Sequence, residues 1–338
     1  MIVVTGGAGF IGSCFIKKLN ELGRTDIIIV DNIGTTNKWK NLLNKDFLDY
    51  FDKTTFIDLI KNNELDNRFD KVLSKFNNID TKIDYIFHFG ACSSTTEMNF
   101  NYLLENNFEY SKLLFNYAKE NSAKFIYASS AATYGLGEFG YSENLTNELR
   151  PLNGYGYSKQ MFDIWLLKNG YINEAIGLKF FNVFGPNEYH KDGMASMIYK
   201  AYNQIKENGY INLFKSNVKE YSNGNQLRDF IYIKDTVDLV WDIVNTNQNG
   251  IYNIGTGQAR SWNDLANSVF NTLKMPTDIR YIDMPQSISK QYQNYTEANL
   301  EKVNKLNSNF KINFKFRTLE ESIADYINNH LNQDWQYL

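Results

Sequence analysis

The chain has 338 residues, of which 43% are hydrophobic and 22% are charged, enough to bury a large core without disulfides. Its 35 basic and 38 acidic residues give a net charge of −3, so the charge balance does not favour nucleic acid as a partner. With 2 cysteines and no apolar run of about 18 residues, we expect neither a disulfide scaffold nor a membrane-spanning helix. No signal peptide precedes the first apolar run, and we therefore expect a cytoplasmic protein of roughly two domains.

The first elements predict a nucleotide-binding turn. An apolar run at Ile2–Val4 is followed by three glycines spaced as GxxGxxG: Gly6, Gly9 and Gly12. Glycine suits such a turn because it adopts positive φ at no steric cost, and the free amides of the helix that follows attract a pyrophosphate. Asp31 ends the next apolar run, Ile27–Val30, where a carboxylate can accept hydrogen bonds from a ribose. The segment therefore predicts a dinucleotide site.

Apolar runs alternate with stretches of helical period through the first half of the chain. This alternation predicts an α/β fold with a doubly wound, Rossmann-type parallel sheet and helices on both faces. We expect strands at Ile2–Val4, Ile27–Val30, Tyr85–His88, Phe125–Ala128 and Ala175–Phe180, and helices at Ile11–Leu22, Asn101–Glu120 and Lys159–Asn169. The polar stretch Asp46–Asn78 predicts a short strand near Phe47-Leu48 and a helix from Asp52 onward.

Beyond Asn182 the alternation loosens, and we expect a smaller carboxyl-terminal α/β lobe. Its predicted helices are Met197–Asn208 and Thr236–Val244, and its predicted strands are Ile211–Phe214, Phe230–Ile233 and Tyr252–Ile254. Ser261 and Asp264 have the spacing of a capping box at a helix start. We expect a Rossmann domain over residues 1–182 and a second lobe over 183–338, with a segment of about 228–256 partly interleaved with the first.

Two further patterns carry chemistry. Tyr155 and Lys159 lie one helical turn apart, and an ammonium beside a phenol lowers its pKa, so that the phenol can act as a base. Ser130 ends a predicted strand, at the edge where open α/β sheets bind ligands. A tyrosine packed on its own helix and a Ser/Ala-rich turn are the alternative interpretations. With 3 histidines and no cluster at ligand spacing, we expect no metal site.

The glycine turn, Ser130 and the Tyr155–Lys159 pair together resemble the extended short-chain dehydrogenase/reductase family over nearly the whole chain. The resemblance implies a lobe that binds a nicotinamide cofactor and a smaller lobe that binds a nucleotide sugar. It further implies that Tyr155 is the acid/base, that Lys159 lowers its pKa and binds the nicotinamide ribose, and that Ser130 orients the reacting oxygen.

Within that family, the chain is similar to the nucleotide-sugar epimerases that invert C6 of an ADP-heptose, a precursor of the lipopolysaccharide core. The motifs are HxGACSSTTE (His88–Glu97), YASSAATYG (Tyr127–Gly135), YGYSK (Tyr155–Lys159), FNVFGP (Phe181–Pro186), HKxGMAS (His190–Ser196), LRDF (Leu227–Phe230) and QYQNYTEA (Gln291–Ala298). The resemblance implies oxidation of the C6 hydroxyl to a ketone and return of the hydride to the opposite face. Two bases then serve the two faces, Tyr155 and Lys191. A solvated loop lysine is the alternative for Lys191.

The resemblance also implies the binding residues and a homo-oligomer. Cofactor contacts are expected from Gly6, Gly9, Phe10, Ile11, Gly12, Asp31, Asn32, Lys38, Lys53, Phe89, Gly90, Ala91, Cys92, Ser93, Asn106, Tyr155, Lys159, Val183 and Lys191. Substrate contacts are expected from Ser130, Asn182, Gly193, Lys200, Phe214, Arg228 and Tyr292. Asp31 favours NAD because a carboxylate repels a 2′-phosphate, whereas Lys38 and Lys40 can neutralise that phosphate. We expect tightly bound NADP, with NAD as the alternative.

Two related activities are weighed against this expectation. A UDP-hexose 4-epimerase would share the fold and the Tyr155–Lys159 pair, but it explains neither ACSSTTE nor Lys191. A sugar-nucleotide dehydratase needs an acid beside the catalytic hydroxyl to expel water, and that place reads Ala131-Ala132. A scaffold that had lost its chemistry would lack the tyrosine or the lysine, and both are present.

Overall fold

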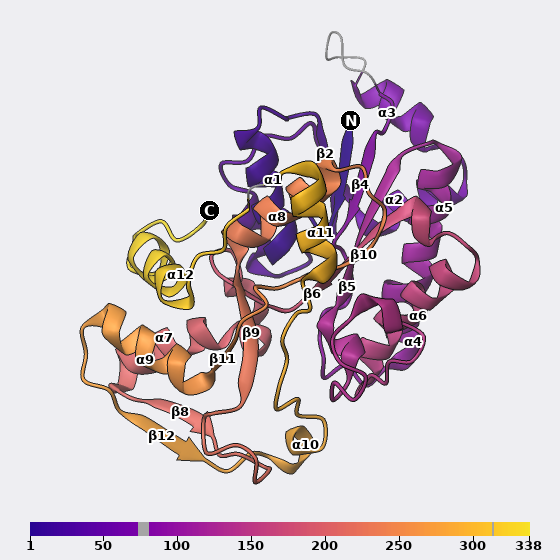
Figure 1. Cartoon of the computed structure of the whole chain (residues 1–338). Helices are drawn as coiled ribbons and strands as arrows, with labels where there is room; N and C mark the ends of the chain where they lie inside the picture. The colour runs from indigo at the N-terminus through magenta and orange to yellow at the C-terminus, as the bar shows by residue number, and fades with distance from the viewer. Residues whose placement is uncertain (74–80, 313) are drawn as a thin grey trace.

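Seven parallel strands form the central sheet of the computed structural model, which describes residues 1–73, 81–312 and 314–338 (Figure 1). They are β1 (Ile2–Thr5), β2 (Ile27–Asp31), β3 (Asp49–Asp52), β4 (Tyr85–His88), β5 (Lys124–Ser130), β6 (Ala175–Phe180) and β10 (Gly250–Ile254). Their order is β10-β6-β5-β4-β1-β2-β3, so the winding reverses between β1 and β4. In open α/β sheets, ligands bind at the carboxyl ends of the strands beside such a reversal.

Helices cover both faces of this sheet, and the strand period decides which residue faces which layer. Ile2 and Val4 pack in one core cluster with α1 (Phe10–Glu21), α8 (Ile233–Asn245) and α11 (Glu301–Phe310). Val3 faces the opposite cluster, under α2 (Lys53–Lys61), α3 (Leu65–Leu73), α5 (Tyr110–Glu120) and α6 (Gly154–Lys168). Because both faces are buried, the strands are continuous apolar runs rather than alternating ones.

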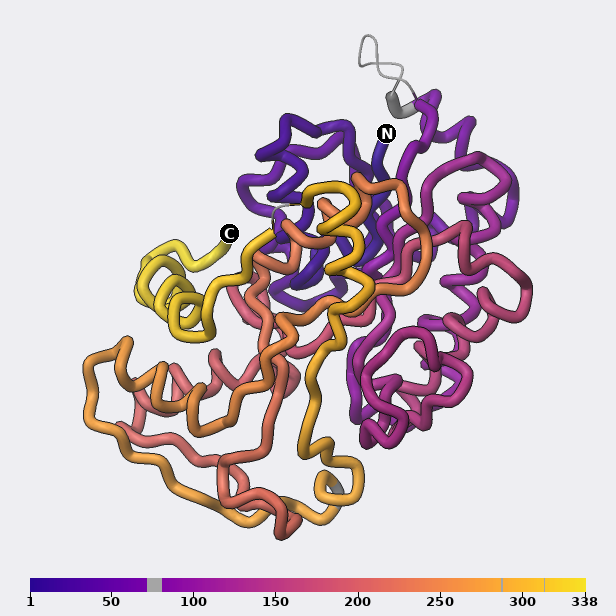
Figure 2. Tube along the Cα trace, viewed as in Figure 1, coloured from indigo at the N-terminus to yellow at the C-terminus, as the bar shows by residue number. Residues whose placement is uncertain are grey.

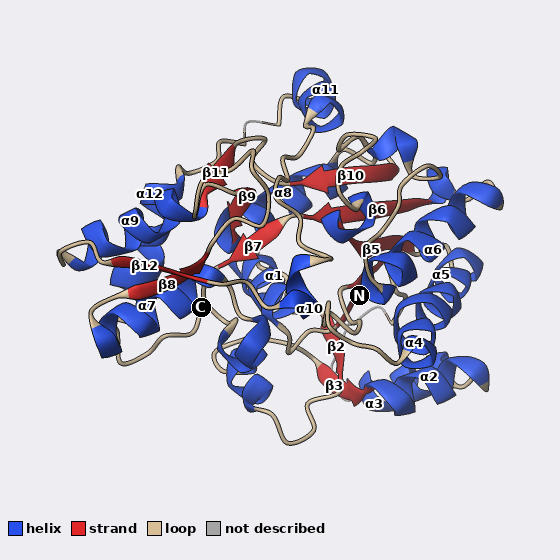
Figure 3. Cartoon of the chain, turned by 90° about the horizontal axis from the view of Figure 1, so that it is seen from below, coloured by secondary structure: helices blue, strands red, loops and turns tan. Residues whose placement is uncertain are grey.

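A smaller lobe lies to one side of the central sheet (Figure 3). β7 (Asn182–Phe184), β9 (Leu227–Tyr232) and β11 (Ala259–Ser261) form a three-stranded sheet, and β8 (Ile211–Phe214) pairs with β12 (Ile279–Ile282). Its helices are α7 (Met197–Asn208) and α9 (Trp262–Leu273), with α12 (Leu319–Tyr326) beside α9. Short α-helices are α4 (Phe100–Leu103) and α10 (Gln286–Ser289). Single 3₁₀ or π turns are η1 (Asn37–Leu42), η2 (Leu104–Glu109), η3 (Ala131–Tyr134), η4 (Glu143–Leu145), η5 (Ile172–Glu174), η6 (Tyr189–Met194) and η7 (Ile327–Leu331).

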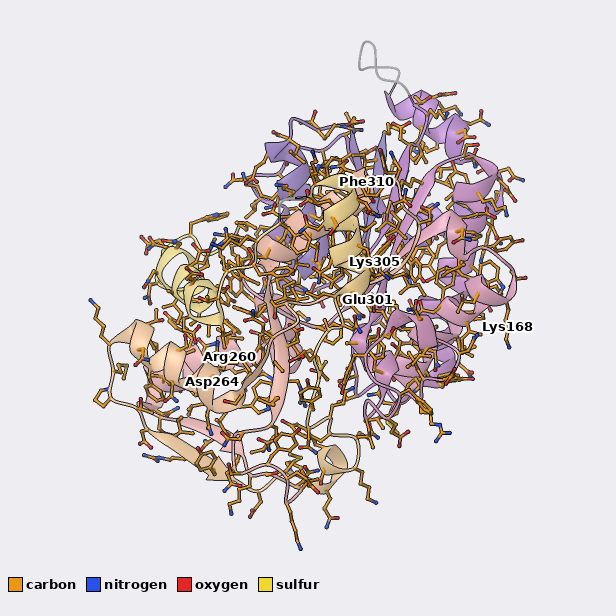
Figure 4. The ribbon with its side chains drawn as sticks, in the orientation of Figure 1. Lys168, Arg260, Asp264, Glu301, Lys305 and Phe310 are labelled. Atoms are coloured by element: carbon orange, nitrogen blue, oxygen red, sulfur yellow. The ribbon has the colours of Figure 1, made fainter. Side chains whose placement is uncertain are left out.

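The chain passes between the two lobes several times (Figure 2). It leaves the central sheet after β6, returns for β10, leaves again for β11 and β12, and comes back as α11 against β10. Two ion pairs lie at the later helices (Figure 4): Glu301 pairs with Lys305 along α11 at 2.7 Å, and Arg260 of β11 pairs with Asp264 of α9 at 3.3 Å. Within the described ranges, no helix combines the length and the apolar character needed to cross a membrane.

The strands predicted in the first half are confirmed to within a few residues, and the capping box of Ser261 and Asp264 is present. Three details differ. The helix predicted at Asn101–Glu120 is interrupted by the π turn η2, and the strand predicted near Phe47-Leu48 is β3, followed by α2. The helix predicted from Lys159 begins earlier, at Gly154, because the Asn153 side chain accepts a hydrogen bond from the Gly156 amide. Residues 74–78 of the polar stretch lie outside the described residues.

Candidate active site

The glycine turn between β1 and α1 leaves no space for side chains. Gly6 has a φ of +67°, and a Cβ on it would lie 2.6 Å from the Gly90 amide nitrogen. A Cβ on Gly12 would clash with the Gly6 carbonyl oxygen. Gly9 precedes α1 and has no side chain to cap the first amides of the helix. These amides therefore stay available for a pyrophosphate at the edge of the sheet.

A cavity of about 420 Å³ lies along this edge. Its lining includes sixteen of the residues expected to bind the cofactor: Gly6, Gly9, Phe10, Ile11, Gly12, Asp31, Asn32, Lys38, Lys53, Phe89, Gly90, Ala91, Cys92, Ser93, Asn106 and Lys191. Sequence reasoning missed Tyr102 and His190, which also line it. The cradle that the three glycines leave open, together with these polar side chains, fits an extended dinucleotide.

Asp31 forms a compact charge cluster with Lys38 at this cavity. Its Oδ1 accepts hydrogen bonds from Lys38 Nζ at 2.6 Å and from the Asn32 amide at 2.7 Å. Its Oδ2 accepts from the Ala8 amide at 2.8 Å, which fixes the glycine turn. Because the ammonium neutralises the carboxylate, the pair repels a nearby phosphate far less than an isolated aspartate would.

A second cavity of about 810 Å³ lies between the central sheet and the smaller lobe. The three expected cofactor residues that do not line the smaller cavity, Tyr155, Lys159 and Val183, line this one. Five expected substrate residues line it as well: Ser130, Asn182, Lys200, Phe214 and Tyr292. Lys191 and Phe10 line both cavities, which therefore meet at these side chains. Arg228 and Gly193 are not among the lining residues of either cavity, and the Gly193 carbonyl instead accepts a hydrogen bond from Lys200 Nζ at 2.6 Å.

Ser130, at the carboxyl end of β5, and Tyr155, on α6, both line the larger cavity. Burial raises the pKa of the Tyr155 phenol, and the interaction with the Ser130 hydroxyl lowers it in part. Lys159 Nζ donates to the Ala128 carbonyl at 2.8 Å, and burial lowers the pKa of this ammonium to about 8. Burial has the largest effect on the Tyr155 phenol in the protein groups alone, and the expectation that Lys159 lowers its pKa stays a prediction.

Lys191 lies on η6, a turn with a strained backbone. The next residue, Asp192, has a φ of +44°, a conformation that is unfavourable for a residue with a Cβ. The Lys191 ammonium lies 5.4 Å from the centre of the Phe10 ring. Burial lowers the pKa of Lys191, Glu188 raises it, and Lys200 lowers it further. The side chain is therefore a partly desolvated lysine at the junction of the two cavities.

Arg228 is held behind the larger cavity by aromatic rings. Its guanidinium lies 4.9 Å from the centre of the Tyr292 ring and 5.6 Å from that of Trp262. Only 6% of Arg228 is exposed, and among the described residues no carboxylate pairs with it. A buried guanidinium without a carboxylate suits a ligand phosphate. The sequence analysis did not identify Trp262 as a site residue, because no motif marks the sequence around it. It also did not identify Gln293 and Thr296, although both belong to the QYQNYTEA motif.

The cysteines and acidic groups form no further site. Cys14 is buried in the core, where burial raises its pKa to about 12, and Cys92 lines the cofactor cavity. In the part of the chain that the structure describes, no three His, Cys, Asp or Glu side chains gather as metal ligands would.

A doubly wound sheet with a glycine turn, and a Ser130–Tyr155–Lys159 set at its carboxyl edge, define an enzyme of the extended short-chain dehydrogenase/reductase type with a nicotinamide cofactor. The model of the NAD dependent epimerase/dehydratase family matches residues 2–255, and the chain belongs to this family.

Relatives of known name cover the whole chain. It is 45% identical over 334 residues to the ADP-L-glycero-D-manno-heptose-6-epimerase of Nitratidesulfovibrio vulgaris strain Hildenborough, with 98% of each chain covered. It is 45% identical over 350 residues to the enzyme of the same name from Fusobacterium nucleatum, with 100% of each covered. The crystal structure of the Helicobacter pylori ADP-L-glycero-D-manno-heptose-6-epimerase is similar, with a TM-score of 0.75 and 28% identity over 97% of this chain and 95% of that one.

Proposed function

We propose that the chain is an ADP-L-glycero-D-manno-heptose 6-epimerase, which interconverts the D-glycero and L-glycero epimers of the ADP-linked heptose. The names of the full-length relatives support this substrate. The observation that carries the proposal is that two candidate bases, Tyr155 from α6 and Lys191 from η6, line one cavity. Such a pair gives each face of a single carbon its own base.

Each residue of the site has its own role in the proposed reaction. A nicotinamide held in the smaller cavity would supply the hydride chemistry at C6, first as acceptor and then as donor. Tyr155 takes or supplies the proton of the C6 oxygen in one epimer, and the Ser130 hydroxyl orients that oxygen. Lys191 does the same for the other epimer, and its lowered pKa makes the neutral amine accessible for this role. Lys159, held on the Ala128 carbonyl, is available to the nicotinamide ribose.

Purified protein incubated with the ADP-heptose tests the proposal, with UDP-glucose as the competing substrate. We expect each epimer of ADP-glycero-D-manno-heptose to be converted to the other, and UDP-glucose to remain unchanged. Conversion of UDP-glucose to its C4 epimer, without reaction of the ADP-heptose, would replace the proposal by a UDP-hexose 4-epimerase.

Arg228→Met is expected to weaken substrate binding and to leave the chemical step nearly intact. We infer that Arg228 binds the diphosphate of the ADP-sugar, because it is the buried guanidinium behind the cavity. Loss of a hydrogen bond to a charged group costs about 1.5–3 kcal/mol, which raises KM roughly ten- to hundredfold. Steady-state kinetics measure this. Arg24→Met is the matched control, because Arg24 pairs with Asp26 before β2, away from both cavities. Unchanged KM in Arg228→Met would remove Arg228 from the binding site.

Lys38→Ala is expected to weaken NADP more than NAD. We propose that NADP is the natural cofactor and that Lys38, which already neutralises Asp31, also contacts the 2′-phosphate. Loss of that contact costs about 1.5–3 kcal/mol of NADP affinity, and the unpaired Asp31 would add repulsion. Titration of both nucleotides, followed by protein fluorescence, measures the effect. Lys40→Ala is the control, because Lys40 lies over the Trp39 ring instead. Equal losses for NADP and NAD in Lys38→Ala would contradict this assignment.

A further inference from the structure

A fully buried ion pair lies beneath the candidate active site. Asp163 on α6 and Lys179 on β6 are joined at 2.7 Å between Oδ2 and Nζ, and neither side chain has exposed surface. Removing two charges from water is unfavourable unless further hydrogen bonds satisfy them, and a pair of apolar residues of similar size often serves stability as well. The pair is therefore better explained by the groups that it holds in place than by stability alone.

The carboxylate of Asp163 ties α6 to β5. Its Oδ1 accepts a hydrogen bond from the Tyr127 hydroxyl at 2.8 Å. Its Oδ2 accepts one from Ser129 Oγ at 2.8 Å, in addition to the contact with Lys179. Ser129 directly precedes Ser130, so the strand residue before the candidate catalytic serine is fixed to the helix that carries Tyr155 and Lys159.

The ammonium of Lys179 holds the other side of Ser130. Lys179 Nζ donates to Thr133 Oγ1 at 2.8 Å, and the Thr133 hydroxyl donates to the Ser130 carbonyl oxygen at 2.8 Å. Thr133 has no exposed surface. Two hydrogen-bonded paths therefore leave the ion pair and reach Ser130, one through Ser129 and one through Thr133.

We propose that the buried Asp163–Lys179 pair is a positioning device for the proton step, which holds Ser130 beside Tyr155 in the larger cavity by way of Ser129 and Thr133. Asp163, Lys179 and Thr133 line neither cavity, whereas Ser129 borders the larger one, and each of the four acts through Ser130. The pair joins the strand end that carries Ser130 to the helix that carries the phenol, so a shift of either element relative to the other would break the contact on which the phenol depends. The inference rests on the proposed function only in the role that it gives to Ser130.

Variants that remove one path at a time test the proposal in the full-length enzyme with its cofactor. Ser129→Ala and Thr133→Val each delete one hydroxyl and keep the shape of the side chain. We expect each to lower kcat roughly ten- to hundredfold, as small misplacements of catalytic groups do, and to leave KM within about twofold. In a Ser130→Ala background, we expect neither change to lower kcat further, because both act through the missing hydroxyl.

Two controls separate positioning from stability. Thr236→Val removes the hydroxyl of another fully buried threonine, which donates to the Tyr232 carbonyl at 2.9 Å away from Ser130. It is expected to lower the Tm as Thr133→Val does and to keep the wild-type kcat. Lys179→Met is expected to lose activity and Lys179→Arg to recover most of it, since a guanidinium can reach both Asp163 and Thr133.

The proposed function and the positioning role of the Asp163–Lys179 pair would be overturned by different results. Wild-type protein that does not epimerise the ADP-heptose would overturn the proposed function. An active wild type in which Ser129→Ala and Thr133→Val lower kcat equally with and without Ser130 would overturn the inference. So would a normal kcat in both folded variants. If Thr133→Val does not fold, Ser129→Ala gives the same comparison at the other path.

Discussion

Tyr155→Phe is expected to lower the rate of C6 epimerisation by about 10²–10⁴-fold, the range typical of a lost general acid/base. The change deletes the phenol oxygen and keeps the ring, so the packing of α6 should persist. Burial raises the pKa of this phenol, so it is protonated in the protein alone and can supply a proton to the C6 oxygen. The measurement is kcat at saturating ADP-heptose, for each epimer as the starting material.

Tyr157→Phe is the control for this variant. Tyr157 lies on the same helix two residues later, is 47% exposed and stacks on Phe100. Its hydroxyl has no part in the proposed chemistry, so we expect the wild-type rate. A Tyr155→Phe enzyme that retains most of its activity would show that another group moves the proton.

Lys191→Met is expected to reduce epimerisation by a similar factor of about 10²–10⁴, because the cycle needs a base on each face. Methionine keeps the length of the side chain and removes the amine. The Tyr155→Phe/Lys191→Met double variant should be little slower than the worse single variant, since groups that act in one cycle do not contribute independently. Rates of the three variants at saturating substrate make this comparison.

Lys206→Met, on the exposed side of α7, is the matched control and should behave as wild type. If Lys191 only binds substrate, Lys191→Met will raise KM and leave kcat near normal. That outcome would contradict the two-base mechanism and would favour a relative that uses Tyr155 alone.

The fold could be predicted from short-range patterns. The central strands are apolar runs because both faces of the sheet are covered. The glycine turn can be recognised in the sequence because close backbone contacts exclude side chains at Gly6 and Gly12. The start of α6 was harder to predict. Gly154 and Gly156 disfavour a helix by intrinsic propensity, and only the cap by Asn153 extends it over Tyr155.

Contacts between residues that are far apart in the chain could not be predicted from sequence spacing. Trp262 and Tyr292 come together around Arg228 only after the smaller lobe has folded, and the spacing of these residues gives no sign of it. Asp163 and Lys179 look like surface charges on a helix and a strand until the order β6-β5 places them in one buried contact. The pKa of Tyr155 likewise depends on burial, which a Tyr-x-x-x-Lys spacing does not report.

In the proposed reaction, one hydride leaves C6 of an ADP-heptose and returns to the same carbon on the opposite face. This transfer can be followed with ADP-D-glycero-D-manno-heptose that carries deuterium at C6, the purified enzyme and its bound nicotinamide in ordinary water. We expect a mixture of both C6 epimers, each with the deuterium retained at C6, and no net change in nicotinamide absorbance. Loss of deuterium to the solvent, or oxidation product formed in step with reduced nicotinamide, would contradict it.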